Sequence, residues 1–469
     1  MRAGRGAHRG DRARMNLWEL SAADLSTGYA AGTFTPRDAL ESILARIEAV
    51  NPKINAIVTM DIAAARAAAD ASAARWQDKA ALGAFDGVPL TVKDNIPVRG
   101  MRATWGSRIY ADWVPEKDEL PIAKLRAGGA VILGKTNCSE FTLQGYCDNP
   151  VFGVTRNPWN LAVTPGGSSG GAVAAVAAGL APVAVGTDGG GSIRRPAAHC
   201  GLVGHKPSRD AVARADGFPA ILLDCEVIGP IARGVADARA LSHALSGTTP
   251  PPAETSRKRR IRYVPQFGGS PVDPEIARNV AAAAKDLEAL GHAVEQGNAP
   301  FDVDALNRAW PVVSQVGLAW LLKDYADRLD DISAPMRDMV RAGNAVAATD
   351  YYAAVAAIIT LREQLAAFFE NCDLILTPSI AALSWPASEA FPPVIDGQSA
   401  GPRGHAVFTA FANMAGCPAI SLPCEPAANG LPIGFQLVGA PGDDEMIFAI
   451  AASYEQARPW SERRPAIAP

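Results

Sequence analysis

A serine that follows three consecutive glycines is the strongest candidate for chemistry in this sequence. In the stretch "TDGGGSIRRP", residues 187–196, Ser192 comes directly after Gly189, Gly190 and Gly191. Glycine loses more backbone entropy on folding than any other residue, so a run of glycines needs a geometric reason. Bare backbone N–H groups can converge on a developing oxyanion without crowding by side chains. We therefore expect Ser192 to be a nucleophile and the three glycines to form an oxyanion hole.

A serine nucleophile needs a base, and this sequence offers a histidine or a lysine. His199 lies close after Ser192, but the G-x-S-x-G turn of many serine–histidine hydrolases is absent around that serine. We therefore expect His199 and His205 to be structural. Lys93 ends the apolar stretch "GVPLTVK", where desolvation would lower its pKa and make it a base. For the rival base, Lys135 in "GKTN", we favour an ion pair or a backbone contact.

A second glycine-rich turn, "PGGSSGG" at 165–171, stands immediately before a predicted helix. Neither this turn nor "GTDGGGS" fits G-x-x-x-x-G-K-[ST] or G-x-G-x-x-G, which argues against a nucleotide site. Ligands of α/β sheets bind beyond the carboxyl ends of the strands. We expect Lys93, this turn and Ser192 to meet at such an edge.

The elements that must position these residues alternate between helix and strand. Thr35 is a predicted N-cap, Pro36 begins a helix, and an alanine-rich helix follows at about 61–77. A strand ending near Lys93 is followed by two helix–turn–strand units, the second at 172–186. This alternation predicts an α/β sheet with helices on both faces. The run 172–186 is shorter than the ~20 residues of a membrane span.

The second half of the chain begins after a proline-rich connector at 248–260. "IRYVPQ" and "CDLILTPSI" are predicted strands, and residues 275–370 are predicted to be mostly helical. A hairpin is expected around Asn429-Gly430, and a last helix at about 443–457.

Composition narrows the class of protein. The formal net charge of −4 gives the whole chain no basic footprint for nucleic acid. The seven cysteines form neither a C-x-x-C pair nor a cluster with histidine, which argues against a disulfide framework and a zinc site. We therefore expect a cytoplasmic protein. Residues 1–14 are arginine-rich without the apolar core of a secretory signal, and we expect a disordered extension.

Four ordered motifs resemble those of the amidase signature hydrolases: "GVPLTVKDN", "GKTNCSEF", "TPGGSSGGAVAAVAAGL" and "GTDGGGSIRRPAAHCGLVGHKP". The resemblance implies one large α/β domain over 15–469, with a central twisted mixed β-sheet covered by helices on both faces. The core motifs span 80–235, and a helical, substrate-shaping segment spans about 275–370.

By motif position, the resemblance implies a catalytic triad of Ser192 as nucleophile, Ser168 as bridging serine and Lys93 as base. It also implies a cis peptide between Gly167 and Ser168, and no metal or organic cofactor. Ser169 is then expected to be a turn or helix-capping residue. The implied reaction is hydrolysis of a carboxylic acid amide, through an acyl-enzyme, to acid and ammonia or amine. The alternative is the glutaminase (A) subunit of a tRNA-dependent amidotransferase complex.

Two segments favour the stand-alone amidase over that alternative. "TLQGYCDNPVFG" after "SEF" is not the serine-rich loop usual in the subunit, and "RGHAVFTAFA" near 403–412 offers no acid for the amino group of glutamine. We therefore expect a small-molecule amide substrate, no nucleic acid and no membrane partner, with a homodimer left open. The loop 141–149 and parts of 310–352 should line the pocket. The expected substrate-binding residues are Trp105, Leu143, Gln144, Tyr146 and Arg195.

The two adjacent arginines are expected to play different roles. Asp188 and Arg194 should form a buried pair that shapes the nucleophile loop. Neighbouring side chains in an extended stretch before proline cannot point the same way. If Arg194 turns to Asp188, Arg195 can face the acyl pocket and recognise a carboxylate or carbonyl group; the alternative is a second structural ion pair.

Overall fold

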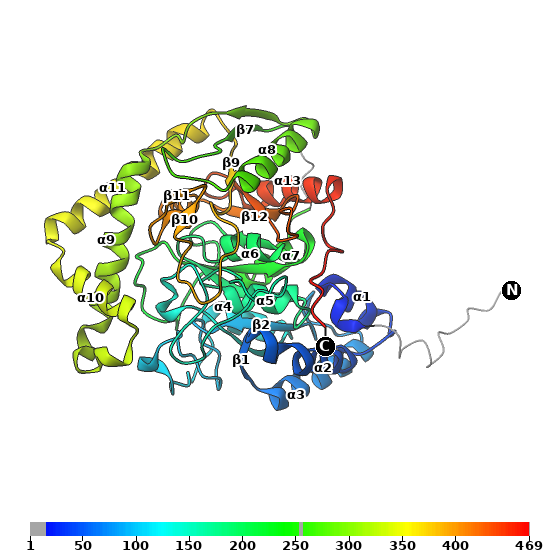
Figure 1. The fold of residues 1–469 in the computed structure, drawn as a ribbon. Coiled ribbons are helices and arrows are strands. Elements are labelled where there is room, and N and C mark those ends of the chain that lie inside the picture. Colours follow the sequence, from blue (N-terminus) through cyan, green and yellow to red (C-terminus); the bar gives the residue numbers. More distant parts are fainter. Residues whose placement is uncertain (1–15, 253–256, 469) are drawn as a thin grey trace.

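One long mixed sheet organises the molecule (Figure 1). The computed structural model describes residues 16–252 and 257–468, so the predicted extension 1–14 lies outside the described residues. In spatial order the eleven strands are β1 (Ile57–Met60), β3 (Val131–Thr136), β2 (Pro89–Lys93), β4 (Val183–Asp188), β6 (Val227–Ala232), β5 (Val203–Lys206), β12 (Ala419–Pro423), β13 (Gly434–Val438), β9 (Leu374–Pro378), β7 (Arg260–Tyr263) and β8 (Ala293–Gln296).

Parallel pairs lie in two groups within this sheet. Strand β2 is parallel to both β3 and β4, and β7 is parallel to both β8 and β9. The strands between the two groups are antiparallel, as is the edge pair β1–β3. A separate two-stranded hairpin is formed by β10 (Val394–Ile395) and β11 (Gln398–Ser399). The mixed sheet predicted from the resemblance is confirmed.

Helices cover both faces of the sheet, as predicted. They are α1 (Ala22–Ala30), α2 (Pro36–Ile54), α3 (Ile62–Gln77), α4 (Leu120–Ala127), α5 (Gly170–Ala177), α6 (Arg194–Cys200), α7 (Val235–Ser246), α8 (Pro274–Ala289), α9 (Val303–Leu322), α10 (Ala334–Ala345), α11 (Ala348–Phe369), α12 (Ala410–Ala415) and α13 (Asp444–Ala457). Short 3₁₀ turns are η2 (Leu17–Glu19), η3 (Arg108–Tyr110), η4 (Glu140–Thr142), η5 (Lys323–Asp331) and η6 (Gly404–Ala406).

Alternation along β4 shows how one strand serves both faces. Val183 and Val185 belong to the apolar core that contains Leu241 of α7. Ala184, between them, belongs to the opposite core, which contains Val173 of α5 and residues of α6. Successive side chains of a strand point to opposite faces, so a strand buried on both sides is apolar throughout, as this one is until it reaches its polar end.

The predicted helix starts and the late hairpin agree with the structure. Thr35 caps α2 by accepting a hydrogen bond from the Asp38 amide, and the Asp38 carboxylate accepts one from the Thr35 amide. The predicted hairpin around Asn429-Gly430 joins the antiparallel strands β12 and β13. Residues 275–370 are mostly helical, with β8 as the exception.

Helices α9, α10 and α11 stand together at one side of the sheet, and we call them the helical arm (Figure 1). Among the described residues, α11 is the one helix long and apolar enough to cross a membrane, by length and composition only. In the folded chain it packs on α9 and α12, with Ile358, Leu361 and Leu365 buried. Its Arg362 also pairs with Asp224 at 2.8 Å. These contacts are those of a helix packed against a protein body.

Strand register places the two key motifs at one edge. In the parallel pair β2–β4, Val92 lies opposite Val185. The carboxyl ends of both strands therefore finish side by side, at Lys93 and at Thr187–Asp188. Helices α5 and α6 begin on the same face and bring the two glycine-rich turns to this edge.

Candidate active site

Lys93 and Ser168 are in direct contact at this edge. The Lys93 ammonium nitrogen lies 2.7 Å from Ser168 Oγ and 2.8 Å from Thr187 Oγ1. Both Lys93 and Ser168 are fully buried. Desolvation by burial lowers the pKa of Lys93 from 10.5 to about 8. A substantial fraction of the lysine is therefore neutral near physiological pH and able to accept a proton.

The turn that carries Ser168 is held against the nucleophile loop. The Gly167–Ser168 peptide is cis, as the resemblance implied. A Cβ atom on Gly167 would lie only 2.3 Å from the Tyr146 carbonyl oxygen, which explains why a glycine stands there. The next amide, that of Ser169, donates to the Ser192 carbonyl at 3.1 Å. This bond brings the two serine-bearing loops together.

Ser169 itself corrects one expectation. It occupies the N-cap position of α5, but its side chain makes no capping hydrogen bond. Its hydroxyl instead donates to the Thr187 carbonyl at 3.2 Å. Ser169 therefore fastens the turn to the end of β4, because α5 begins in a buried position where a strand carbonyl competes for the hydroxyl.

Asp188 shapes the loop that presents Ser192. Its carboxylate accepts from the backbone amides of Gly191 at 2.7 Å and Ile193 at 3.1 Å. It also receives both arms of the Arg194 guanidinium, at 3.0 and 2.9 Å. Burial opposes ionisation of Asp188, but the charge and hydrogen bonds of Arg194 hold its pKa well below the usual range. The predicted buried pair is confirmed.

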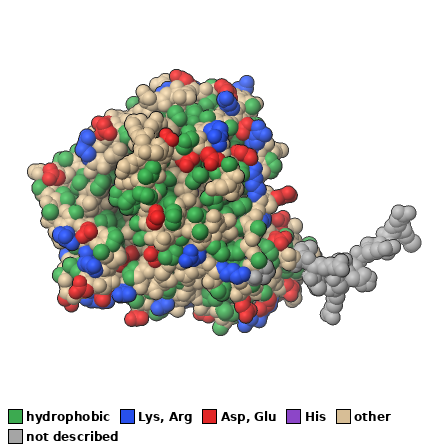
Figure 2. Space-filling model, in the orientation of Figure 1, with side chains coloured by type: hydrophobic (Ala, Val, Ile, Leu, Met, Phe, Trp, Pro, Cys, Tyr) green, Lys and Arg blue, Asp and Glu red, His purple; other side chains and the backbone are tan. Residues whose placement is uncertain are grey.

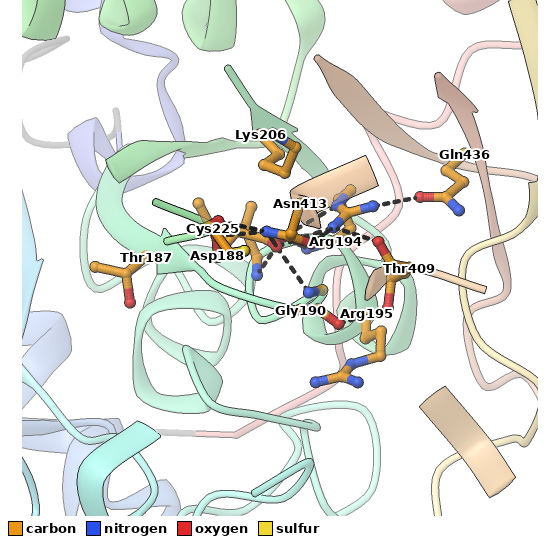
Figure 3. A network of polar contacts seen from close by, with 12 residues as sticks. Thr187, Asp188, Gly190, Arg194, Arg195, Lys206, Cys225, Thr409, Asn413 and Gln436 are labelled. Atoms are coloured by element: carbon orange, nitrogen blue, oxygen red, sulfur yellow. Dashed lines mark hydrogen bonds and ion pairs between the residues drawn. The ribbon is translucent and has the colours of Figure 1, made fainter. Parts of the chain in front are cut away.

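Side chains distant in the sequence complete this network (Figure 3). Asn413 Nδ2 donates to the Asp188 carboxylate at 2.9 Å, and its carbonyl oxygen accepts from Arg194 at 2.6 Å. Gln436 Oε1 accepts from Arg194 at 2.8 Å. Sequence reasoning missed Asn413 and Gln436, because single polar residues on α12 and β13 carry no local motif.

The glycines before Ser192 lie where side chains would collide. A Cβ on Gly190 would lie 2.7 Å from Trp310, and one on Gly191 would lie 2.2 Å from Thr409 Oγ1. Gly191 also has a φ of 115°, which only glycine adopts without strain. Thr409 Oγ1 donates to the Gly190 carbonyl at 2.7 Å and so fixes that peptide.

The amides of the glycine run are not all equally available. The Gly191 N–H is already donated to Asp188, so it does not point freely toward a substrate. Within residues 16–252 and 257–468, the structure gives the N–H groups of Gly189, Gly190 and Ser192 no protein acceptor. Those three amides are the better candidates for binding an oxyanion.

A cavity of about 730 Å³ opens beside the nucleophile loop. Leu143, Gln144 and Arg195 line it, and all three were predicted substrate contacts. The helical arm supplies another wall through Trp310 and Met336. Figure 2 shows hydrophobic side chains gathered around a hollow beside the helical arm. The cavity is therefore mainly apolar, with a few polar groups on its walls.

Two predicted pocket residues lie elsewhere. Trp105 is 2% exposed and packs against Phe141 and Phe218, lining a second cavity of about 350 Å³. Tyr146 lines neither cavity; its main chain packs against Gly167. An aromatic side chain near a motif can fill a core as readily as a pocket, so sequence position alone does not separate the two.

The rival bases have structural partners. Lys135 donates to the Asp94 carbonyl at 3.1 Å and lies 3.8 Å from its carboxylate, which confirms the predicted ion pair. His199 contacts the Ala382 carbonyl at 3.1 Å, and His205 lies 3.3 Å from Asp444. Within the described residues, no group of three or more His, Cys, Asp or Glu side chains is arranged to hold a metal ion.

Known proteins resemble this chain over almost its full length. The A subunit of the glutamyl-tRNA(Gln) amidotransferase of Moorella thermoacetica is 34% identical over 493 aligned positions, covering 96% of this chain and 99% of its own. The structure of a 6-aminohexanoate cyclic dimer hydrolase complexed with substrate is 30% identical, with a TM-score of 0.86 and coverage of 96% and 99%. A bacterial aryl acylamidase of the amidase signature family is 28% identical, with a TM-score of 0.87 and coverage of 94% and 97%.

These relatives correct the prediction about partners. The curated relatives that align over nearly the whole chain are named as subunits of an amidotransferase and after a tRNA. The expectation of a small-molecule substrate with no nucleic acid is therefore wrong. It rested on net charge and on two loops, and neither reports on partners: the charge of a whole chain averages over its surfaces, and loops diverge on a shared scaffold.

The family itself rests on the whole chain rather than on loops. The family model described as Amidase matches residues 38–448, which include all four motifs and both halves of the sheet. Solved structures of amidase signature enzymes superpose on the same span. The chain therefore belongs to the amidase signature family, whose enzymes are hydrolases of carbon–nitrogen bonds.

Proposed function

We propose that this chain hydrolyses an amide through an acyl-enzyme on Ser192, with Ser168 as proton relay and Lys93 as base. The observation that carries the proposal is the 2.7 Å contact between the Lys93 nitrogen and Ser168 Oγ. The contact is buried, and the pKa of Lys93 is lowered to about 8 by desolvation. A neutral amine hydrogen-bonded to a hydroxyl can accept its proton as that hydroxyl takes one from a neighbour.

The proposed reaction proceeds in two halves. Ser192 Oγ attacks the amide carbonyl while its proton passes to Ser168, and the Ser168 proton passes to Lys93. The tetrahedral oxyanion is held by the amides of Gly189, Gly190 and Ser192. The C–N bond breaks as the relay returns the proton to the leaving nitrogen. Water then attacks the acyl-enzyme by the same route and releases the acid.

The curated relatives favour a more specific function, that of the glutaminase subunit of a tRNA-dependent amidotransferase. Two of the relatives with that name align with 96% of this chain at 34% identity. In this role the amide would be glutamine, and the released ammonia would pass to a protein partner acting on tRNA. The loops named above favour the other specific function, hydrolysis of a different acid amide by the chain alone.

One experiment tests the shared chemistry and separates the two specific functions. Ammonia release is measured from glutamine and from aliphatic and aryl amides, with the wild type and with Ser192→Ala. The proposal expects release that depends on Ser192. In parallel, the tagged chain is isolated from its own host, and copurifying proteins and RNA are identified. Glutamine turnover that rises with copurifying partners supports the amidotransferase role; partner-free turnover of other amides, with none on glutamine, supports the stand-alone enzyme.

A further inference from the structure

Two arginines face the cavity beside Ser192 without an acidic partner. Arg195 lies in the first turn of α6, and Arg403 lies just before η6. Both line the 730 Å³ cavity. Buried charges in proteins are normally paired, because removal of an ion from water is costly. Two unpaired guanidiniums on one cavity therefore need an explanation.

Arg195 is separated from the network of its neighbour. Figure 3 shows Arg194 turned toward Asp188 and Gln436, and Arg195 turned away from them. Arg195 is 5% exposed, its Nε has no hydrogen-bond partner, and its bond to the Gly167 carbonyl is long at 3.4 Å. Within the described residues no carboxylate lies within ion-pair distance of it.

Arg403 is held by an aromatic ring rather than by an acid. Its guanidinium carbon lies 5.6 Å from the centre of the Trp310 ring. The same tryptophan lies against Gly190 of the nucleophile loop. No ion pair of Arg403 occurs among residues 16–252 and 257–468. Stacking on an aromatic face orients a guanidinium while its N–H donors stay free.

The electrostatics of the cavity favour an anion. Burial and the charge of Arg403 lower the pKa of Arg195 to about 9, and burial lowers the pKa of Arg403 to about 10. Asp338 is the one carboxylate among the described residues that line the cavity. It lies on α10 with a side chain 69% exposed, paired with Arg341 at 2.9 Å. It leaves the positive charge of Arg195 and Arg403 uncompensated.

We propose that Arg195 and Arg403 together bind a carboxylate on the acyl part of the substrate. This inference rests on the proposed function, since it concerns the amide that acylates Ser192. The substrate class is the ω-monoamide of a dicarboxylic acid, a class that includes glutamine. A planar guanidinium fork matches a carboxylate in geometry, and the pair would recognise it from two sides. The apolar wall supplied by Leu306 and Met336 would contact the methylene chain between amide and carboxylate.

The test compares anionic amides with neutral amides of similar length. The monoamides of succinic and glutaric acid and glutamine are measured against butyramide and pentanamide. We expect Arg403→Gln to raise KM for the anionic set roughly 10- to 100-fold, the effect of losing one charge-assisted hydrogen bond. The neutral amides should change less than about twofold, and Arg403→Lys should recover part of the loss. Arg278→Gln, an exposed arginine on α8, is the matched control.

A binding measurement keeps this inference separate from the catalytic proposal. Calorimetry of glutarate and butyrate is carried out on Ser192→Ala, which needs no turnover. Glutarate binding that is weakened by Arg403→Gln and by Arg195→Gln, with butyrate binding unaffected, supports the inference even if no tested amide is hydrolysed. Equal binding of glutarate and butyrate, or equal loss of both amide sets in Arg403→Gln, overturns it. Loss of thermal stability alone in both variants would make them scaffold residues and also overturn it.

Discussion

The amino group of Lys93 is shared between two hydroxyl groups, those of Thr187 and Ser168. It lies 2.8 Å from Thr187 Oγ1 and 2.7 Å from Ser168 Oγ. Asn95 Nδ2 donates to the same threonine oxygen at 3.1 Å. The base is thus positioned by neutral acceptors, which can stabilise a transient ammonium without fixing it in a permanent ion pair. An adjacent carboxylate would instead keep the lysine protonated.

Replacement of the nucleophile should abolish turnover and leave the fold intact. We expect Ser192→Ala to lower kcat by about three orders of magnitude or more, because the acyl-enzyme cannot form. A fluorophosphonate probe should label Ser192 in the wild type, as checked by peptide mass spectrometry. Ser168→Ala should also lose activity while Ser192 stays in place. Label on Ser168 or Ser169 with Ser192 unlabelled would refute the assignment.

The pH profile should report the protonation of Lys93. Its pKa is lowered from 10.5 to about 8 by desolvation, and only the neutral amine accepts a proton. We therefore expect kcat/KM to rise with pH through neutrality and to level off above about 8. The measurement is the rate across pH 6 to 10 with a neutral amide, so that substrate ionisation does not contribute.

Lys135 supplies the matched control for the base. It is equally buried and its pKa is also lowered by burial, but it faces Asp94 rather than a serine hydroxyl. Lys93→Met should remove activity at every pH. Lys135→Met should lower the melting temperature and leave the midpoint of the pH profile of the remaining activity unchanged. An active Lys93→Met with an inactive, folded Lys135→Met would reverse the assignment.

Local motifs predicted the parts of this site that lie close together in the sequence. Asp188 and Arg194 are six positions apart, so their pairing followed from one loop. The parallel strands β2 and β4 followed from alternating helix and strand patterns, and their shared edge placed Lys93 near Ser192. These relationships depend on short-range geometry, which the order of residue types largely determines.

The missed parts depend on packing between distant segments. Asn413 and Gln436 reach Arg194 across 219 and 242 positions. Arg403 lies on an irregular loop, and only the packing of the helical arm brings Trp310 under it. Hydrophobic periodicity predicts that the arm is helical but not where its ends lie relative to the sheet. The one available signal was unpaired arginines in otherwise apolar surroundings, which a sequence without contacts cannot show.

The pair Asp188–Arg194 should matter for stability in a pH-dependent way. Asp188→Asn leaves a buried guanidinium without its counter-charge, and we expect a loss of about 3–5 kcal/mol in the free energy of unfolding. The folded-state pKa of Asp188 lies below its ordinary value of 3.8. Its ionised form therefore contributes stability above pH 3.8, and the contribution is lost as pH falls further toward the folded-state pKa.

Urea unfolding of both proteins at several pH values checks this prediction. The gap between wild type and Asp188→Asn should be constant from pH 8 to pH 5 and should narrow only in stronger acid. Asp210→Asn, whose side chain is 92% exposed, is the control and should change stability by less than about 0.5 kcal/mol. A gap that closes already between pH 7 and pH 5 would contradict the sign of the shift.

The glycine at position 190 should be needed because of Trp310. A Cβ there would lie 2.7 Å from Cζ2 of the indole, below any normal contact. We expect Gly190→Ala to lower kcat/KM by about tenfold or more, since a shift of the loop moves the oxyanion amides. Trp310→Phe removes the colliding atom, so the double variant should regain activity relative to Gly190→Ala. Kinetics of the four proteins form a double-mutant cycle, and simple additivity would refute the steric explanation.

The hydroxyl of Thr187 should tune the base, and Thr187→Val tests this without a change in shape. The threonine oxygen accepts a hydrogen bond from the Lys93 nitrogen, and acceptance favours the charged form of the amine. Its loss should lower the pKa of Lys93 below about 8 and move the rise of kcat/KM to lower pH. The plateau rate should also fall by about tenfold, because the amine is less well aligned with Ser168. Thr187→Ser restores the hydroxyl and should restore both the midpoint and most of the rate. A merely structural threonine would give a lower rate with an unchanged midpoint in the valine variant, and that result would remove Thr187 from the set of positioning residues.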